Sequence, residues 1–233
     1  NAATLAELGA AWRVQQLHAD LDTALAQGLD GALVHAATGA HPDILRRLLE
    51  AGVATLVDKP IADNLVDSEA LVDLAETRGV SLMVGFNRRF APAYREAAAL
   101  NLPLVVMQQN RPGPLDDVRR AVFDDYIHVV DTLRFLAPGA REAAVRGRVR
   151  DGRLEHVVLS LSGDGCDAVG IMNRVSGGSE ELLEVSGQGR KRSISDLEQI
   201  VDHGPVEALT RRGNWTSVGR QRGFEAMCEH FLD

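Results

Sequence analysis

The sequence has few cysteines and few aromatic residues, and it has no long apolar run. Its two cysteines, Cys166 and Cys228, form no Cys-x-x-Cys pair. This usage favours a reduced, cytoplasmic protein over a disulfide-rich secreted one. No apolar run approaches the ~18 residues of a membrane-spanning helix, and the first residues carry no signal-peptide pattern. We therefore predict a cytoplasmic protein without membrane contact.

The chain also lacks an excess of positive charge. Its formal net charge is -8 and its pI is near 5.4, and no pattern of basic and aromatic residues marks a nucleic-acid surface. Five histidines are scattered without the spacing of metal ligands: His18, His35, His156, His203 and His230. We therefore predict neither a nucleic-acid partner nor a metal site.

The 233 residues have an ordinary globular composition, 45% hydrophobic and 25% charged, which suffices for one large domain or two smaller ones. The sequence opens with Asn1 directly before a helical pattern at residues 2–11, and it stops inside another pattern at residues 222–233. We therefore expect the chain to be a segment of a longer protein, or its ordered part.

The first hundred residues alternate between strand and helix patterns. Short apolar runs predict strands at residues 31–35, 53–57 and 80–84. Helices are predicted at residues 42–51, with Pro42 in the first turn and Gly52 after the end, and at residues 64–78, with Gly79 as the stop signal. Such alternation predicts βαβ units and a parallel sheet. Ligands of these sheets bind beyond the carboxyl ends of the strands, where residues 38–41, 58–60 and 87–89 supply polar groups.

The pattern changes after about residue 100. Strands are predicted at residues 104–108, 143–150, 154–162 and 166–173, with a helix at residues 123–136 and a hairpin turn at residues 186–189. Alternation of buried and polar positions suits a sheet with at least one covered face. We therefore predict two domains, residues 1–100 and residues 101–233.

Within the predicted helix at residues 123–136, Asp124 and His128 are i and i+4, so both side chains leave the same face. Asp131 lies three residues further along that face and could either brace the helix or touch a ligand. A carboxylate beside an imidazole can orient the ring and hold its proton on one nitrogen. From the pattern alone, a solvated or capping pair is the more common reading.

Four motifs carry a family resemblance, and they run in the family's order. They are Ala37-Thr38 followed by His41, Asp58-Lys59-Pro60, Gly85-Phe86-Asn87-Arg88-Arg89-Phe90, and the segment from Asp124 to Asp131. With them the chain resembles the Gfo/Idh/MocA family of NAD(P)-dependent oxidoreductases, and most of all its MviM-type branch. The resemblance covers essentially the whole chain. The second and third motifs are fairly specific together and weak alone.

The resemblance implies an α/β protein with a Rossmann-type parallel sheet domain, whose N-terminal part is missing here, followed by an α+β domain with an open, mainly antiparallel sheet. It implies NAD or NADP as cofactor, a sugar, cyclitol or related polyol as substrate, and a homodimer or homotetramer formed through the open sheet. The family's catalytic residues fall on Lys59, Asp124 and His128. Its cofactor-binding positions fall on Ala37, Thr38, His41, Asp58, Lys59, Pro60, Asn87 and Arg88.

The chain departs from the family pattern in several places. The Gly-x-Gly-x-x-Gly loop that would cradle the pyrophosphate is absent, and Gly187-Gln188-Gly189 lies too late in the chain to replace it. Asp58 replaces the more usual glutamate. Asp125 and Tyr126 stand where many relatives carry smaller or apolar residues. We expect them to narrow the pocket, with substrate contacts from Tyr126, Lys59 and His128.

Oxidation of an alcohol removes a hydride from carbon and a proton from oxygen. His128 has the ordinary pKa of a base, near ~6.5, and Asp124 could fix its tautomer. Lys59 could donate a hydrogen bond to the substrate oxygen and stabilise the developing charge. We therefore predict an NAD(P)-dependent dehydrogenase acting on CH-OH groups. The alternative is a catalytically silent family member that senses a dinucleotide or a metabolite.

Some of these residues also have simpler readings. Lys59 could be a surface lysine at a strand end, and His41 could be only a residue of a helix N-terminus. Of Arg88 and Arg89, we expect one to lie near the cofactor and one to be structural.

Overall fold

The computed structural model describes residues 2–233, which form two compact units divided between Gly85 and Phe86. The division lies earlier than the predicted boundary near residue 100. The reason is the packing of helix α5 (Pro92–Ala99), whose Tyr94 and Ala97 are buried in the core of the second unit.

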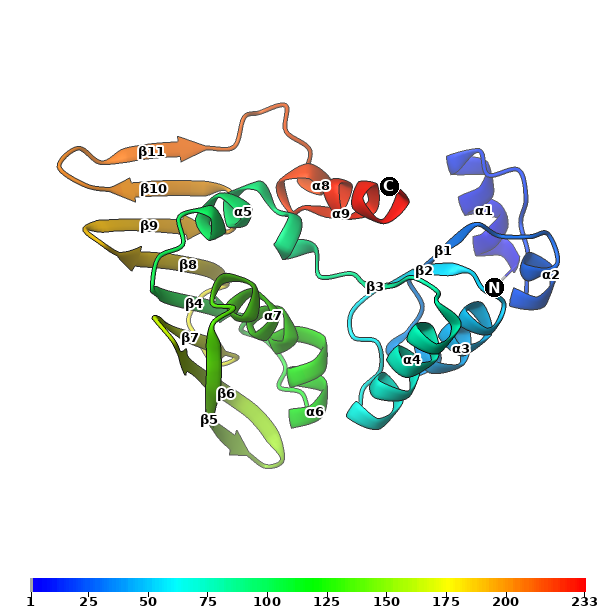
Figure 1. The fold of residues 1–233 in the computed structure, drawn as a ribbon, viewed down its shortest axis with the longest axis horizontal. Coiled ribbons are helices and arrows are strands. Elements are labelled where there is room, and N and C mark those ends of the chain that lie inside the picture. Colours follow the sequence, from blue (N-terminus) through cyan, green and yellow to red (C-terminus); the bar gives the residue numbers. More distant parts are fainter. Residues whose placement is uncertain (1) are drawn as a thin grey trace. The chain divides into compact units, whose positions relative to one another are not determined.

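The first unit is built on a parallel sheet with the strand order β1-β2-β3. The strands are β1 (Gly31–Val34), β2 (Ala54–Val57) and β3 (Leu82–Val84), and the helices are α1 (Ala2–Trp12), α2 (Leu21–Leu25), α3 (His41–Glu50) and α4 (Leu65–Arg78). Helices α3 and α4 lie next to each other beside the sheet (Figure 1). Leu45, Leu48 and Leu49 of α3 and Leu71 of α4 form one core with the sheet. The predicted βαβ arrangement is confirmed.

The ends of α4 follow from the residues that cap it. Asn64 accepts a hydrogen bond from the Asp67 amide at 2.9 Å, which satisfies an unpaired donor of the first turn. Gly79 ends the helix with φ +63°, a left-handed conformation that glycine adopts without strain. Both residues act where the sequence predicts them to act.

The second unit contains one eight-stranded sheet with the order β11-β10-β9-β8-β4-β7-β6-β5. The strands are β4 (Leu104–Asn110), β5 (Ala140–Arg150), β6 (Arg153–Gly163), β7 (Cys166–Asn173), β8 (Glu180–Gly187), β9 (Arg190–Ser195), β10 (Gln199–His203) and β11 (Ala208–Arg211). Neighbours are antiparallel except β4 and β7, which are parallel. Parallel pairing brings the carboxyl ends of β4 and β7 to the same edge of the sheet.

Helices cover one face of this sheet (Figure 1). Helix α7 (Ile127–Leu136) packs its buried Val129 and Leu133 over Gly170 of β7. A Cβ at position 170 would lie 2.6 Å from Val129 Cγ1, so only glycine allows this approach. On the opposite face, Val106, Val158, Val169 and Leu182 stay partly exposed. The predicted α+β domain with an open, mainly antiparallel sheet is confirmed.

The helical segment before α7 differs from the regular helix predicted at residues 123–136. It begins with α6 (Val118–Arg120), continues as a π-helix, η3 (Ala121–Tyr126), and becomes α-helical only at Ile127. A π-helix bonds each amide to the fifth residue before it, and side-chain spacing cannot distinguish it from an α-helix. The predicted helix is thus present, but residues 123–126 have π winding in place of α winding.

Short helices complete the second unit: η2 (Asn87–Phe90), α8 (Val218–Gln221) and α9 (Phe224–Leu232). Among residues 2–233, none of the helices combines the length and the apolar character needed to cross a membrane.

Candidate functional site

Two loops of the first unit carry its predicted site residues. Ala37 and Thr38 follow β1, where Thr38 opens the short helix η1 (Thr38–Ala40), and Asp58, Lys59 and Pro60 follow β2. Because β1 and β2 are parallel, with Val34 paired to Val57, both loops leave the same edge of the sheet. The Asp58 amide donates to Val34 O at 2.9 Å and ties the start of the second loop to the end of β1. The fold thus brings these predicted residues together.

The side chain of His41 connects the two loops through hydrogen bonds to their backbone. Its side chain is buried, with Nδ1 2.8 Å from Pro60 O and Nε2 3.0 Å from Ala36 O. Carbonyl oxygens only accept hydrogen bonds, so the ring is the donor, and a neutral ring can donate to only one of them. His41 therefore braces the loops. The cofactor contact predicted for His41 stays a prediction. Burial of the ring between two backbone carbonyls does not favour it.

The loop after β1 combines small exposed residues with polar side chains. Ala36, Ala37 and Gly39 are exposed and small, and a Cβ at Gly39 would meet nothing within 4 Å. Thr38 adds a hydroxyl, and Lys59 is partly exposed. The Asp58 carboxylate accepts from the Lys59 amide at 2.8 Å and fixes the turn that carries the lysine. Small exposed residues beside a hydroxyl and a cation allow a ligand to approach the backbone closely.

In the second unit, Asn87 and Arg88 lie in η2, and both are buried. Asn87 Nδ2 donates to Arg222 O at 2.7 Å. Arg88 forms a two-pronged ion pair with Glu181 of β8, with Nε and Nη2 at 2.8 and 2.5 Å from the two carboxylate oxygens. Both side chains hold η2 to the rest of their unit. Their predicted contacts with the cofactor remain untested predictions.

Glu181 is the centre of a buried polar cluster. Besides Arg88, Tyr94 Oη donates to it at 2.9 Å and Gln109 Nε2 at 3.0 Å. Burial opposes ionisation of Glu181, but the hydrogen bonds from its three partners hold its pKa below the usual value. Burial and the adjacent carboxylate raise the pKa of Tyr94, which therefore remains a donor. The cluster joins η2, α5, β4 and β8.

Arg89 forms the second ion pair of η2. Its guanidinium donates to Asp131 of α7 at 2.6–3.0 Å and lies 5.9 Å from the ring centres of Phe86 and Phe135. Burial raises the pKa of Asp131 in spite of this partner. Of the two roles open to Asp131, the contact with Arg89 supports that of a brace. Both arginines of the motif thus have structural partners.

Asp124 and His128 occupy the transition from the π-helix to α7. Asp124 lies in η3, its side chain is 43% exposed, and its carboxylate is 3.4 Å from Arg120 Nε. His128 lies in the first turn of α7 and is partly exposed. The wider π turn changes the angle around the helix axis between these two side chains, compared with a regular α-helix. Single π turns occur frequently at functional sites.

Two of the three residues between this pair, Asp125 and Tyr126, bond to different partners. Tyr126 is 3% exposed and donates to Gly170 O at 2.8 Å, and burial raises its pKa. This places its hydroxyl in the core, so the predicted substrate contact of Tyr126 is not supported. Asp125 instead accepts from Arg111 at 2.6 Å and from Arg174 at 2.7 Å.

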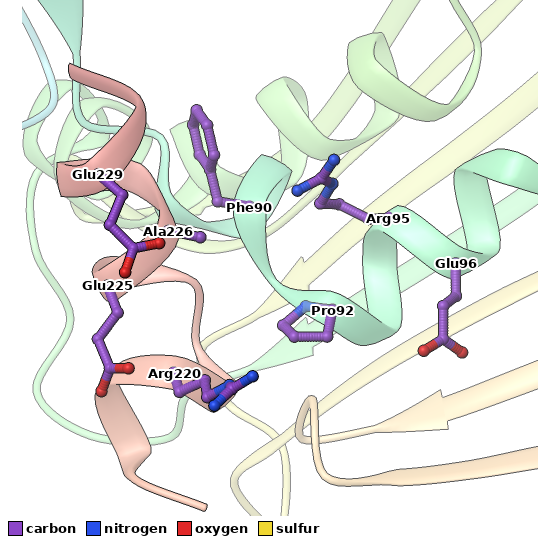
Figure 2. Close-up of a pocket in the computed structure, with 8 residues that line it drawn as sticks. All are labelled: Phe90, Pro92, Arg95, Glu96, Arg220, Glu225, Ala226 and Glu229. Atoms are coloured by element: carbon purple, nitrogen blue, oxygen red, sulfur yellow. The ribbon is translucent and has the colours of Figure 1, made fainter. Parts of the chain in front are cut away.

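A separate cavity of about 430 Å³ lies between α5 and the helices α8 and α9 (Figure 2). Its walls carry both charges: Arg95, Glu96, Arg220, Glu225 and Glu229, with Phe90, Pro92 and Ala226. None of the residues predicted for the site lines it. In residues 2–233, no group of three His, Cys, Asp or Glu side chains could hold a metal ion.

Comparisons with known proteins match both units. Residues 1–86 match the family profile described as "Oxidoreductase family, NAD-binding Rossmann fold", and residues 92–203 match "YceM-like, C-terminal domain". The protein named "Putative oxidoreductase YceM" of Salmonella typhimurium is 34% identical over 95% of this chain and 74% of its own length. The chain belongs to the Gfo/Idh/MocA family of oxidoreductases.

Other relatives agree with this membership. The myo-inositol dehydrogenase Hyg17 of Streptomyces leeuwenhoekii is 41% identical, over 48% of the chain and 38% of its own length. The dehydrogenase MviM of Clostridium difficile superposes with a TM-score of 0.93 at 29% identity, covering all of this chain and 78% of its own. A Gfo/Idh/MocA oxidoreductase from Vibrio cholerae has the same TM-score, 27% identity and the same coverage. The chain is thus an oxidoreductase of the MviM type, in a family with an NAD-binding Rossmann fold.

Sequence reasoning missed two groups of residues. Glu181, Tyr94 and Gln109 gave no signal, because Glu181 lies between 72 and 93 residues along the chain from the three side chains that donate to it. Arg111 and Arg174 gave a faint one, since Arg174 directly follows the strand predicted at residues 166–173 and Arg111 follows shortly after the strand predicted at residues 104–108. Only the parallel pairing of β4 and β7, which are distant in the chain, brings these two arginines to one carboxylate.

Proposed function

We propose that the protein containing this chain is an NAD(P)-dependent dehydrogenase that oxidises a CH-OH group of a sugar, cyclitol or related polyol. The observation that carries the proposal is the joint presence of Lys59, Asp124 and His128 in a chain of this family. Lys59 lies in the loop that follows β2 of the Rossmann-type sheet, and the other two lie on the helical segment formed by η3 and α7. Relatives named for inositol and apiose dehydrogenases support the substrate class.

His128 would take the proton of the substrate hydroxyl. An imidazole exchanges protons near neutral pH, and it is partly exposed in this chain. Asp124 would orient the ring and favour the imidazolium that forms. Lys59 would donate a hydrogen bond to the substrate oxygen and stabilise the alkoxide as charge develops.

Ala37, Thr38, Asp58 and Pro60 would hold the nicotinamide end of NAD or NADP, because they lie on the two loops that leave the same edge of the sheet after β1 and β2. The bound cofactor supplies the hydride chemistry, and the protein supplies its orientation. The residues that would distinguish NAD from NADP are not among these positions.

Two finer features complete the proposal. The open face of the second sheet would join copies into a homodimer or homotetramer, since an uncovered face with apolar side chains favours association. The apolar side chains on this face are Val106, Val158, Val169 and Leu182.

The protein would be cytoplasmic, because both Cys166 and Cys228 are free thiols, which suits a reducing compartment.

The test uses the full-length protein in which this chain occurs. Titration with NAD(H) and NADP(H), followed by nicotinamide fluorescence, should give micromolar binding of one of them. A screen with myo-inositol, scyllo-inositol and aldoses should then give turnover. His128→Ala should abolish turnover and leave cofactor affinity unchanged, and His18→Ala, a histidine outside both loops, serves as control. Absence of binding by a folded protein would refute the proposal and favour the catalytically silent, sensing member.

A further inference from the structure

The parallel pair β4 and β7 sets two arginines side by side. Asn110 and Asn173 are register partners at the ends of these strands, and the Arg111 amide donates to Asn173 O at 3.1 Å. Arg111 and Arg174 are therefore the first residues beyond the same edge of the sheet. This edge faces the segment that carries Asp124 and His128, because both guanidiniums reach it.

Both arginines converge on one carboxylate. Arg111 Nη1 donates to Asp125 Oδ1 at 2.6 Å, and Arg174 Nη1 donates to Asp125 Oδ2 at 2.7 Å. The side chains of Asp125 and Arg174 are only 20% and 10% exposed, so these charge-assisted bonds are partly shielded from water. Arg174 is held in turn by Pro114 O at 3.0 Å and by Asp116 at 3.2 Å.

Asp125 lies inside the π turn η3, and the next residue is anchored as well. The Tyr126 hydroxyl donates to Gly170 O in the middle of β7, while Asp125 is tied to the ends of β4 and β7. Two consecutive side chains thus bind the π turn to the sheet from two directions. Unfavourable local conformations persist where surrounding contacts over-determine them, and a π turn is such a conformation.

We propose that Asp125 is a positioning residue that holds the π turn and thereby sets the orientation of Asp124 relative to His128. Asp124 belongs to the turn and His128 is the second residue after it, so a change from π to α winding would rotate one against the other. The proposal rests on the proposed function for its catalytic consequence. Its structural part, the dependence of the π turn on Asp125, stands apart from any activity.

The variant that tests this role is Asp125→Asn in the full-length protein. Asparagine keeps the size, but its amide nitrogen must face one of the two arginines, so one bond is lost and one N–H contact becomes repulsive. The matched control is Asp202→Asn. Asp202 accepts two bonds at 2.7 Å from Arg192 within the same unit, on β9 and β10.

In turnover, we expect kcat of Asp125→Asn to fall about 10- to 100-fold, because small misplacements of catalytic groups cost this much. KM and the dissociation constant of the nicotinamide cofactor should stay within about twofold of wild type. Asp125→Glu should restore part of kcat, since it restores both bonds. Arg111→Gln should lower kcat similarly, and the double variant with Asp125→Asn should be no worse than the poorer single one. A kcat loss equal to that of Asp202→Asn would contradict the proposal.

A crystal structure of Asp125→Asn decides the structural part. Conversion of residues Ala121–Tyr126 to α winding, or loss of their order, supports it, and an unchanged π turn overturns it. If the wild-type protein binds a nicotinamide cofactor but turns over no polyol, the proposed function fails while this structural result still decides the role of Asp125.

Discussion

Arg88 and Glu181 form a buried two-pronged ion pair, with side chains only 5% and 9% exposed, that ties η2 to β8. Such a pair is costly to desolvate, and it persists here because Tyr94 and Gln109 complete the hydrogen bonds of the carboxylate. The third motif shared with the family, Gly85 to Phe90, therefore places one of its arginines in the core of the second unit. The same motif holds α7 through Arg89 and Asp131.

Removing the charge of Glu181 should destabilise the protein strongly. In Glu181→Gln, Arg88 would remain buried without a counter-charge, and breaking such a pair costs about 3–5 kcal/mol. Chemical denaturation followed by circular dichroism would measure the loss. The control is Glu184→Gln, on the same strand, whose pair with Lys191 is 41% and 45% exposed and should contribute less than about 1 kcal/mol. Equal losses in the two variants would contradict the buried-pair account.

The stability of the second unit should fall in acid because of the same carboxylate. The pKa of Glu181 lies below its usual value of 4.5 in the folded protein, so the unfolded chain binds more protons between the two values. Stability that Glu181 contributes is complete above pH 4.5 and is lost as the pH falls toward the lowered pKa.

Asp131 makes stability change with pH in the opposite direction to Glu181. Its pKa is raised above 3.8, so the folded protein binds more protons just above that value and loses stability as the pH rises there.

The contribution of Glu181 is measured by denaturing wild type and Glu181→Gln from pH 7 to 3. The difference between their free energies of unfolding should shrink below pH 4.5. A difference constant over this range would show that ionisation of Glu181 is not the cause.

The sequence predicts most elements of the fold, because its signals are local. Asn64 and Gly79 mark the ends of α4 as the structure has them, and the apolar runs of the first unit place β1, β2 and β3 within a few residues. The π turn escapes prediction because Asp124 and His128 show the same spacing in either winding. The partner of Arg88 escapes it because Glu181 is 93 residues away and belongs to a strand whose neighbours in the sheet are set by tertiary packing.

Adding one methyl group at Gly170 should displace α7. The Cβ of Gly170→Ala would lie 2.6 Å from Val129 Cγ1 and 2.7 Å from Leu133 Cδ1. Overpacking of this kind costs about 1–3 kcal/mol, and kcat should also fall because His128 lies in the first turn of the displaced helix. Gly177→Ala, where a Cβ meets nothing within 4 Å, should change neither quantity. Wild-type stability and kcat in Gly170→Ala would show that α7 tolerates the shift.

Loss of the His41 ring should loosen the two loops of the first unit. In His41→Leu, the carbonyl that accepts from the ring, Pro60 O or Ala36 O, would lose its buried donor, at a cost of about 1–3 kcal/mol for an unsatisfied group. Hydrogen exchange at the amides of Asp58 and Lys59 should accelerate, since Asp58 also bonds to Val34 O in the same turn. Cofactor affinity of the full-length protein should fall, because Thr38 and Lys59 lie on the loops that the ring joins. His41→Gln, which can still donate to one carbonyl, should keep part of both properties. A His41→Leu variant with wild-type exchange and reduced affinity would instead indicate direct contact of the ring with the cofactor.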